Sequence, residues 1–178
     1  MTASTKPSPS RPADDTGTPL ADTTGTPHGE HLHAPVIDWF DEHARDLPWR
    51  RPEAGPWGVM VSEFMLQQTP VSRVLPVYEQ WLARWPRPAD LAQEAPGEAV
   101  RAWGRLGYPR RALRLHGAAV AITERHGGDV PTDHAQLLAL PGIGEYTAAA
   151  VASFAYGQRH AVLRLVHPAA ARRRVEDA

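Results

Sequence analysis

The chain has 178 residues, of which 42% are hydrophobic, and its 19 basic residues nearly balance its 20 acidic ones. This length and apolar content suit one globular domain, while the charge balance gives no whole-chain electrostatic argument for a nucleic-acid partner, so DNA binding would have to come from local features. The absence of cysteine excludes disulfides, thiolate zinc sites and a cysteine-ligated iron–sulfur cluster within this chain.

The first 34 residues are predicted to form a disordered tail. They are rich in Thr, Pro, Ser, Asp and Gly, and they hold too few large apolar side chains to offset the entropy of ordering. The histidines His28, His31 and His33 suggest a metal site, but their polar surroundings favour a solvated linker. No apolar run approaches the roughly 20 residues of a membrane span or resembles a secretory signal, so we expect a cytoplasmic protein.

From Pro35 onward the apolar residues recur at helical spacing, and no segment of useful length alternates as a strand does. Pro35 suits the first position of a helix, Pro76 should kink a later one, and Gly127 and Gly128 should end the longest. Helices are expected over 58–68, from Thr69 to Trp85, and over 88–93, 96–103 and 109–126. The sequence therefore predicts an all-α domain over 35–162.

A glycine-containing hairpin comes next along the chain. Thr132 can cap a short helix that runs into Leu138, residues 140–144 read LPGIG, and Gly157 can end the small-residue helix that follows. The glycines allow positive φ and close backbone approach, so the amides of the hairpin and the next helical turn converge where an anion fits. This segment resembles the helix-hairpin-helix element with which repair proteins hold a DNA phosphate, usually helped by a monovalent cation. The alternative is a plain glycine turn between packed helices.

Three more motifs precede this hairpin: LPW at 47–49, SEFMLQQT at 62–69 and WGRLGY at 103–108. Together with LPGIG, in this order over about residues 35–163, they resemble the MutY-type adenine DNA glycosylases of the helix-hairpin-helix glycosylase superfamily. The resemblance implies an all-α, six-helix glycosylase core, with the family's iron–sulfur domain incomplete here. It also implies a monomer that acts on double-stranded DNA and hydrolyses the N-glycosidic bond of adenine mispaired with 8-oxoguanine or guanine, in base-excision repair.

Two positions match catalytic residues of this family. Glu63 matches the glutamate that protonates adenine at N7, and its apolar helical setting beside Phe64 and Met65 should raise its pKa toward neutrality. An isolated glutamate would more simply be a surface helix residue. Tyr146 stands where the related endonuclease III group has a lysine that cuts the strand through a Schiff base. Because tyrosine has no amine, the resemblance implies a monofunctional glycosylase.

The resemblance also assigns residues to DNA and base binding. Gln68 matches the residue that wedges into the duplex where adenine leaves, and Tyr108 matches one that inserts beside the lesion base, because chemistry on a base requires flipping it out. Taken alone, Tyr108 would be a core or turn aromatic. The other DNA contacts expected from the motifs are Gln67, Gly142, Ile143 and Gly144. The positions that match the family's adenine pocket are Trp49, Arg50 and Val71, and for Trp49 and Val71 simple core packing stays open.

One dense basic stretch precedes and enters the longest helix. Its members are Arg101, Arg105, Arg110, Arg111 and Arg114. We expect them to contact phosphates near Tyr108, although a solvated helix face is an equal alternative.

The sequence departs from the family beyond the hairpin helix. Counted from the second glycine of the hairpin, the family's catalytic aspartate is due at position 164, where this sequence has Arg164. That carboxylate should stabilise the oxocarbenium-like sugar, and a cation would repel it. The cluster cysteines and the domain that recognises 8-oxoguanine are not matched either. We therefore expect a frameshift after Leu163, an aberrant Arg- and Ala-rich tail over 163–178, and a weak or inactive enzyme.

Other functions stay open beside this interpretation. The chain could be a noncatalytic DNA-binding remnant, which salt-dependent duplex binding without base release would select. It could also be an endonuclease III-like glycosylase of other base specificity. A helical protein-interaction scaffold has no positive feature in its favour.

Overall fold

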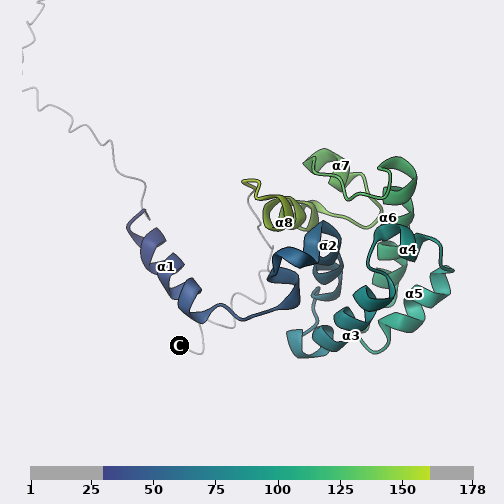
Figure 1. Cartoon of the computed structure of the whole chain (residues 1–178), viewed down its shortest axis with the longest axis horizontal. Helices are drawn as coiled ribbons and strands as arrows, with labels where there is room; N and C mark the ends of the chain where they lie inside the picture. The colour runs from purple at the N-terminus through teal and green to yellow at the C-terminus, as the bar shows by residue number, and fades with distance from the viewer. Residues whose placement is uncertain (1–29, 161–178) are drawn as a thin grey trace, which may run out of the picture. The chain divides into compact units, whose positions relative to one another are not determined.

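The computed structural model describes residues 30–160, and side chains from residue 33 onward. Within this range the chain is helical and contains no strand, as the apolar spacing predicted (Figure 1). None of the helices in this range is long and apolar enough to cross a membrane. The α-helices are α1 (Glu30–His43), α2 (Gly55–Met65), α3 (Val71–Arg84), α4 (Pro88–Ala92), α5 (Pro96–Trp103), α6 (Arg110–Arg125), α7 (His134–Leu138) and α8 (Glu145–Tyr156). Two short 3₁₀ helices are η1 (Pro48–Arg50) and η2 (Pro52–Ala54).

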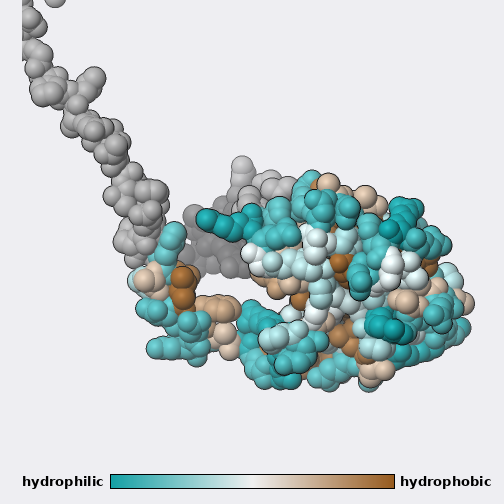
Figure 2. All heavy atoms as spheres, turned by 45° about the horizontal axis from the view of Figure 1, so that its top comes forward, coloured by the Kyte–Doolittle hydropathy of each residue, from teal (hydrophilic) through white to brown (hydrophobic). Residues whose placement is uncertain are grey.

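α1 belongs to a unit of its own, and the other described elements form a second unit from Asp46 onward. α1 begins at Glu30 and has Pro35 inside it, so the prediction that Pro35 opens this helix was wrong. Pro35 is the sixth residue of α1, so the helix lacks the hydrogen bond that a backbone N–H at this position would donate to the residue four positions earlier. Hydrophobic side chains lie on α1 (Figure 2), and they include Val36, Ile37, Trp39 and Phe40.

Both predicted tails fall wholly or largely outside the described range. The tail over 1–34 overlaps the start of α1, and its earlier residues are outside this range, as are the side chains of His28 and His31. The C-terminal segment over 163–178, with Arg164, is outside it as well. The predictions for these segments therefore stay predictions.

α2 is the central helix of the second unit. It packs against α3, α6 and α8, and almost all of its residues are buried. Its sequence, GPWGVMVSEFM, is apolar on nearly every face, as a helix enclosed by others requires. Gly58 allows a close approach to α3, because a Cβ there would lie 2.7 Å from the Tyr78 hydroxyl. Burial raises the pKa of this Tyr78 hydroxyl to about 12. Glu63 is the one charged residue of α2, so the core fixes where its carboxyl group lies.

Indole rings pack where α3 meets α5. Trp81 lies edge-on to Trp85 and to Trp103, with ring centroids 4.7 and 5.6 Å away. Trp57 from α2 donates its Nε1–H to the Trp85 carbonyl at 3.1 Å. Such aromatic pairs each add about 0.5–1.5 kcal/mol beyond the area that they bury, so this cluster gives α2 a rigid support.

Within the second unit, the largest differences from the predicted helix boundaries are at the two ends of α2. α5 has the predicted bounds, whereas α2 covers 55–65 instead of 58–68, so that Gln67 and Gln68 lie in a turn. Gln68 has a φ of +55°, which is outside the helical region. Pro70 also disfavours helical backbone at the residue before it. The prediction of a helix through position 68 was wrong because these backbone constraints end it earlier.

Candidate active site

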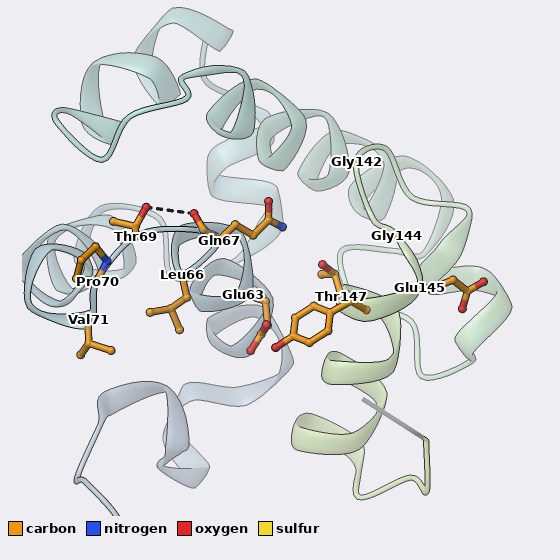
Figure 3. Close-up of a pocket in the computed structure, with 11 residues that line it drawn as sticks. Glu63, Leu66, Gln67, Thr69, Pro70, Val71, Gly142, Gly144, Glu145 and Thr147 are labelled. Carbon is orange, nitrogen blue, oxygen red and sulfur yellow. Dashed lines mark hydrogen bonds between the residues drawn. The ribbon is translucent and has the colours of Figure 1, made fainter. Parts of the chain in front are cut away.

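A cavity of about 670 Å³ opens between the end of α2 and the hairpin before α8. Its volume lies within the range of about 300–1,000 Å³ that is usual for small-molecule pockets. Figure 3 shows Glu63 between the turn after α2 and the hairpin. The residues that line the cavity are Glu63, Leu66, Gln67, Thr69, Pro70, Val71, Gly142, Gly144, Glu145, Tyr146 and Thr147.

The two predicted catalytic residues, Glu63 and Tyr146, both line this cavity. They stand 83 positions apart (146 − 63) in the sequence, but α2 and α8, which carry them, pack against each other. Both side chains are partly buried, so each lies at the boundary between the core and the cavity. A carboxyl group and a phenol in one partly apolar cavity are groups that can donate a proton to a bound base. Their chemical roles stay predictions.

The turn after α2 carries both glutamines of the predicted DNA-contacting tract. Gln67 lines the cavity, whereas Gln68 is exposed and has the positive φ noted above. Thr69 is buried, and its Oγ1 lies 3.2 Å from the Gln67 carbonyl oxygen (Figure 3) and 3.4 Å from that of Leu106. Either carbonyl can accept the proton of this hydroxyl. Thr69 therefore links the turn after α2 to the turn that precedes Tyr108.

Tyr108 ends the turn that follows α5. Its side chain is 65% exposed, so it is not a core aromatic. Among the described residues, Gln68 and Tyr108 are the two non-glycine residues with positive φ, and the φ of Tyr108 is +50°. Trp103 donates its Nε1–H to the Gly107 carbonyl at 3.0 Å and anchors this turn to the core. The two residues predicted to enter the duplex thus share exposure and an uncommon backbone conformation.

Arg111 does not take the role expected for the basic stretch. It is only 6% exposed, and burial lowers the pKa of its guanidinium group. One terminal nitrogen donates to the carbonyl oxygens of Phe64 at 3.1 Å, Met65 at 3.3 Å and Gln67. The other donates to Thr69 Oγ1 at 3.1 Å and to the carbonyl oxygens of Leu106 at 3.3 Å and Gly107 at 3.1 Å. The prediction that Arg111 contacts phosphate was wrong, because the side chain is buried and both terminal nitrogens donate inside the protein.

The other arginines of this stretch lie on the surface. Arg105, Arg110 and Arg114 are exposed, and Arg101 is exposed and ion-paired with Glu98. Exposed cations near Tyr108 suit phosphate contact as well as a solvated helix face, so both interpretations of these residues stay open.

The hairpin forms the opposite side of the cavity from the turn after α2. Gly142 has a φ of +77°, and a Cβ at this position would lie 2.6 Å from the Cβ of Arg114, so this position requires glycine. Ile143 is 8% exposed and belongs to the core, so its side chain anchors the hairpin. Gly144 caps α8, and Gly157 in the left-handed conformation ends that helix, as predicted.

The short helix before the hairpin, α7, is capped by Asp133 and not by the predicted Thr132. The carboxylate of Asp133 accepts the backbone N–H of Gln136 at 2.9 Å. Both residue types cap helices, but Asp133 stands at the position from which a side-chain oxygen reaches the third helical amide. Thr132 uses its carbonyl oxygen to accept the side-chain amide of Gln158 at 2.8 Å. This bond ties the segment after α8 to the start of α7.

The residues predicted for an adenine pocket do not all reach the cavity. Val71 lines it, whereas Trp49 is 9% exposed and packs edge-on against Tyr78, with ring centroids 5.1 Å apart. This packing agrees with the core alternative for Trp49. Arg50 is exposed at the end of η1. Contact of these residues with a base stays a prediction.

The residues present do not fit the iron–sulfur cluster that the family resemblance implies. Such a cluster is held by cysteine thiolates, and the 178 residues contain no cysteine. Within 30–160 there is also no group of three His, Cys, Asp or Glu side chains that could hold a metal ion.

Sequence reasoning missed two residues of this region and gave a third the wrong role. Thr69 and Thr147 are buried polar residues that line the cavity, and neither was assigned a role. Arg111 lies at helical spacing from Leu115 and Ile122 on the buried face of α6, so the periodicity could have flagged a buried arginine. Its acceptors could not have been foreseen, because one of them lies 47 residues away.

Comparison with known proteins supports the interpretation of the hairpin and its two flanking helices as a helix-hairpin-helix motif. A family model described as the helix-hairpin-helix motif matches residues 125–154. This match covers α7, the hairpin and most of α8.

Similar proteins cover most of this chain. An adenine DNA glycosylase of Mycolicibacterium smegmatis is 53% identical over 144 residues, which are 76% of this chain and 49% of that protein. An adenine DNA glycosylase of Homo sapiens is 40% identical over 136 residues, which are 72% of this chain and 25% of that protein. Among solved structures, a thermostable thymine-DNA glycosylase has a TM-score of 0.68 at 26% identity and covers 74% of this chain and 60% of its own. The chain thus spans half or less of the length of these two curated relatives.

Proposed function

Because this chain belongs to the MutY-type adenine DNA glycosylases of the helix-hairpin-helix superfamily, we propose that it acts on duplex DNA in base-excision repair. The proposed reaction is hydrolysis of the N-glycosidic bond of adenine that is mispaired with 8-oxoguanine or guanine. The chemistry of this particular chain is weak, because Arg164 takes the place of the aspartate that would stabilise the sugar cation.

The observation that carries this proposal is the shared cavity of Glu63 and Tyr146. Glu63 projects from a buried helix, so its carboxyl group is held in one place relative to whatever enters the cavity. A purine flipped from the duplex needs a closed pocket with a positioned acid, because protonation turns the base into a viable leaving group. A cavity of about 670 Å³ has room for such a base.

DNA binding is proposed for the side of the molecule that carries the hairpin and the two exposed turns. Backbone amides around Gly142 and Gly144 would hold one phosphate, with a monovalent cation as helper. Gln68 and Tyr108 would enter the base stack, where they fill the space that the flipped base leaves. Both lie on turns bonded to Arg111, so they are presented from one rigid part of the protein.

The test is single-turnover adenine release from a duplex that contains one 8-oxoguanine:adenine pair. Arg164→Asp should raise the rate by about a hundred- to a thousandfold, since one preorganised charge partner has about this effect. On the Arg164→Asp background, Glu63→Gln should lower the rate by about a hundred- to ten-thousandfold, because it removes the proton donor.

The two substitutions separate the parts of the proposal. Glu63-dependent release without a gain from Arg164→Asp would contradict the impairment and keep the glycosylase activity. An adenine-release rate that Glu63→Gln does not change, or no release from any variant, would contradict the proposed chemistry. Salt-dependent duplex binding without release would select the noncatalytic alternative.

A second candidate is a glycosylase for another base. The match to a structure named as a thymine-DNA glycosylase favours it, although that match is at lower identity than those to the adenine enzymes. The same assay with a guanine:thymine duplex distinguishes the two. Faster thymine release than adenine release by Arg164→Asp would select this candidate.

A further inference from the structure

Arg111 joins two turns that are far apart in the sequence. One is the turn after α2 (residues 66–70), and the other is the turn after α5 (residues 104–109). We call these the glutamine turn and the tyrosine turn. The guanidinium group of Arg111 bonds to Gln67 and Thr69 on the first and to Leu106 and Gly107 on the second.

The two terminal nitrogens of Arg111 bond to different sets of acceptors. Nη1 donates to the last two carbonyl oxygens of α2, the helix that carries Glu63, and to the carbonyl oxygen of Gln67 in the glutamine turn. Nη2 donates to both carbonyls of the tyrosine turn and to Thr69 Oγ1. Because a guanidinium group is planar and stiff, its two nitrogens keep a fixed separation. The guanidinium group therefore fixes the distance between the two turns, and the Thr69 hydroxyl adds a second link to Leu106.

Each turn also presents one residue in a conformation that side chains rarely adopt. Gln68 and Tyr108 have φ values of +55° and +50°, and both are exposed. Such backbone persists where the surroundings enforce it, and it concentrates at functional positions. The ring of Tyr108 lies over the guanidinium group, with 5.4 Å between the Arg111 Cζ and the ring centroid. Arg111 thus contacts the tyrosine ring as well as the backbone on which it stands.

We propose that Arg111 is a positioning residue that holds Gln68 and Tyr108 at a fixed spacing, so that both side chains enter the duplex together. The inference rests on the proposed function, because it assumes that these two residues enter DNA. Two inserted groups unstack a base only if both reach their places at once, and a small misplacement of one can remove most of the effect. Arg111 acts through the two turns and touches no base.

The test uses the full chain and a duplex in which 2-aminopurine replaces the mispaired adenine opposite 8-oxoguanine. The fluorescence of 2-aminopurine rises when the base leaves the stack, so it reports insertion without requiring bond cleavage. Duplex affinity is measured in parallel at several salt concentrations, since phosphate contacts dominate that quantity. Thermal melting of each variant checks that it is folded.

Two variants break the link by different routes. Arg111→Lys keeps the positive charge but has one nitrogen, which cannot occupy both terminal positions. Thr69→Val keeps the volume and removes the hydroxyl through which the two turns are also connected. The matched controls are Arg125→Lys, on an exposed residue of the same helix, and Thr123→Val, whose hydroxyl bonds only within α6. If Arg111→Lys does not fold, Thr69→Val carries the test.

We expect both variants to bind the duplex within about threefold of the unmodified chain. The fluorescence rise should fall about tenfold in Arg111→Lys and less in Thr69→Val, and it should not change in the controls. An undiminished rise in both variants would overturn the inference alone. A loss of affinity in proportion to the loss of fluorescence would also overturn it, because it would indicate a general effect on binding. No rise with the unmodified chain would overturn the inference together with the proposed base flipping.

Discussion

The two sides of the cavity are built on different principles. The glutamine turn is held from outside, by an arginine that reaches from α6 to the Gln67 carbonyl oxygen, 44 residues away, and to the Thr69 hydroxyl. The hairpin is built from its own residues: Gly142 makes the turn, the Ile143 N–H donates to the Leu140 carbonyl at 3.2 Å, and Gly144 starts α8. A turn bonded to a distant side chain can be weakened by one substitution elsewhere, whereas the conformation of the hairpin depends first on the residues within it.

The largest expected effect tests the side that is held from outside. Arg111→Met should lower the free energy of unfolding by about 3 kcal/mol or more, because several buried carbonyl oxygens and one hydroxyl lose their donor. The positive charge at the C-terminal end of α2 is lost as well. Urea denaturation at equilibrium measures the change.

Arg125→Met is the control for this substitution, since Arg125 is exposed on the same helix. It should change the free energy of unfolding by less than about 0.5 kcal/mol. A loss below about 1 kcal/mol in Arg111→Met would show that the turn is held by its own residues, and the contrast between the two sides would disappear.

The next effect tests the side that is built from its own residues. Gly142→Ala should lower the free energy of unfolding by about 2 kcal/mol, of which about 1 kcal/mol comes from the positive φ. The rest comes from the new Cβ, which would lie 2.6 Å from the Cβ of Arg114. Gly127→Ala separates the two terms, since Gly127 has a φ of +64° and no atom within 4 Å of a new Cβ. Equal losses in the two variants would mean that the hairpin does not depend on the fit at Arg114.

The same contrast explains which parts of the site could be predicted from the sequence. The hairpin and the end of α8 were predicted correctly, because glycines at 142 and 157 are local signals with a local effect. The glutamine turn was taken for the end of a helix, since the φ of Gln68 and the bonds from Arg111 depend on segments that only the fold brings together. Motif matching selected Glu63 and Tyr146 separately, and the structure brings both to one cavity, while their catalytic roles stay predictions.

The all-α class was the most predictable property of the fold. Apolar spacing repeats in each helix, and this repetition tolerates errors at single residues. The role of Arg111 was the least predictable. A charged residue on a buried helix face indicates that it has partners, but the sequence does not identify them. Two of the six acceptors are carbonyl groups at the end of α2 and four lie on the two turns, and all are ordinary backbone or hydroxyl groups.

The smallest expected effect is at the start of α7, where a capping bond supports the hairpin side locally. Asp133→Ala should lower the free energy of unfolding by about 1 kcal/mol, because the N–H of Gln136 loses its acceptor. Thr132→Ala is the matched control: its carbonyl oxygen, which accepts from Gln158, is retained, so a near-zero change is expected. A larger loss in Thr132→Ala than in Asp133→Ala, by thermal or urea unfolding, would reverse the assignment of the cap. The loss should stay at about 1 kcal/mol because α7 is also held by the packing of Leu137, which is fully buried in the core, so the cap adds to that packing and does not replace it.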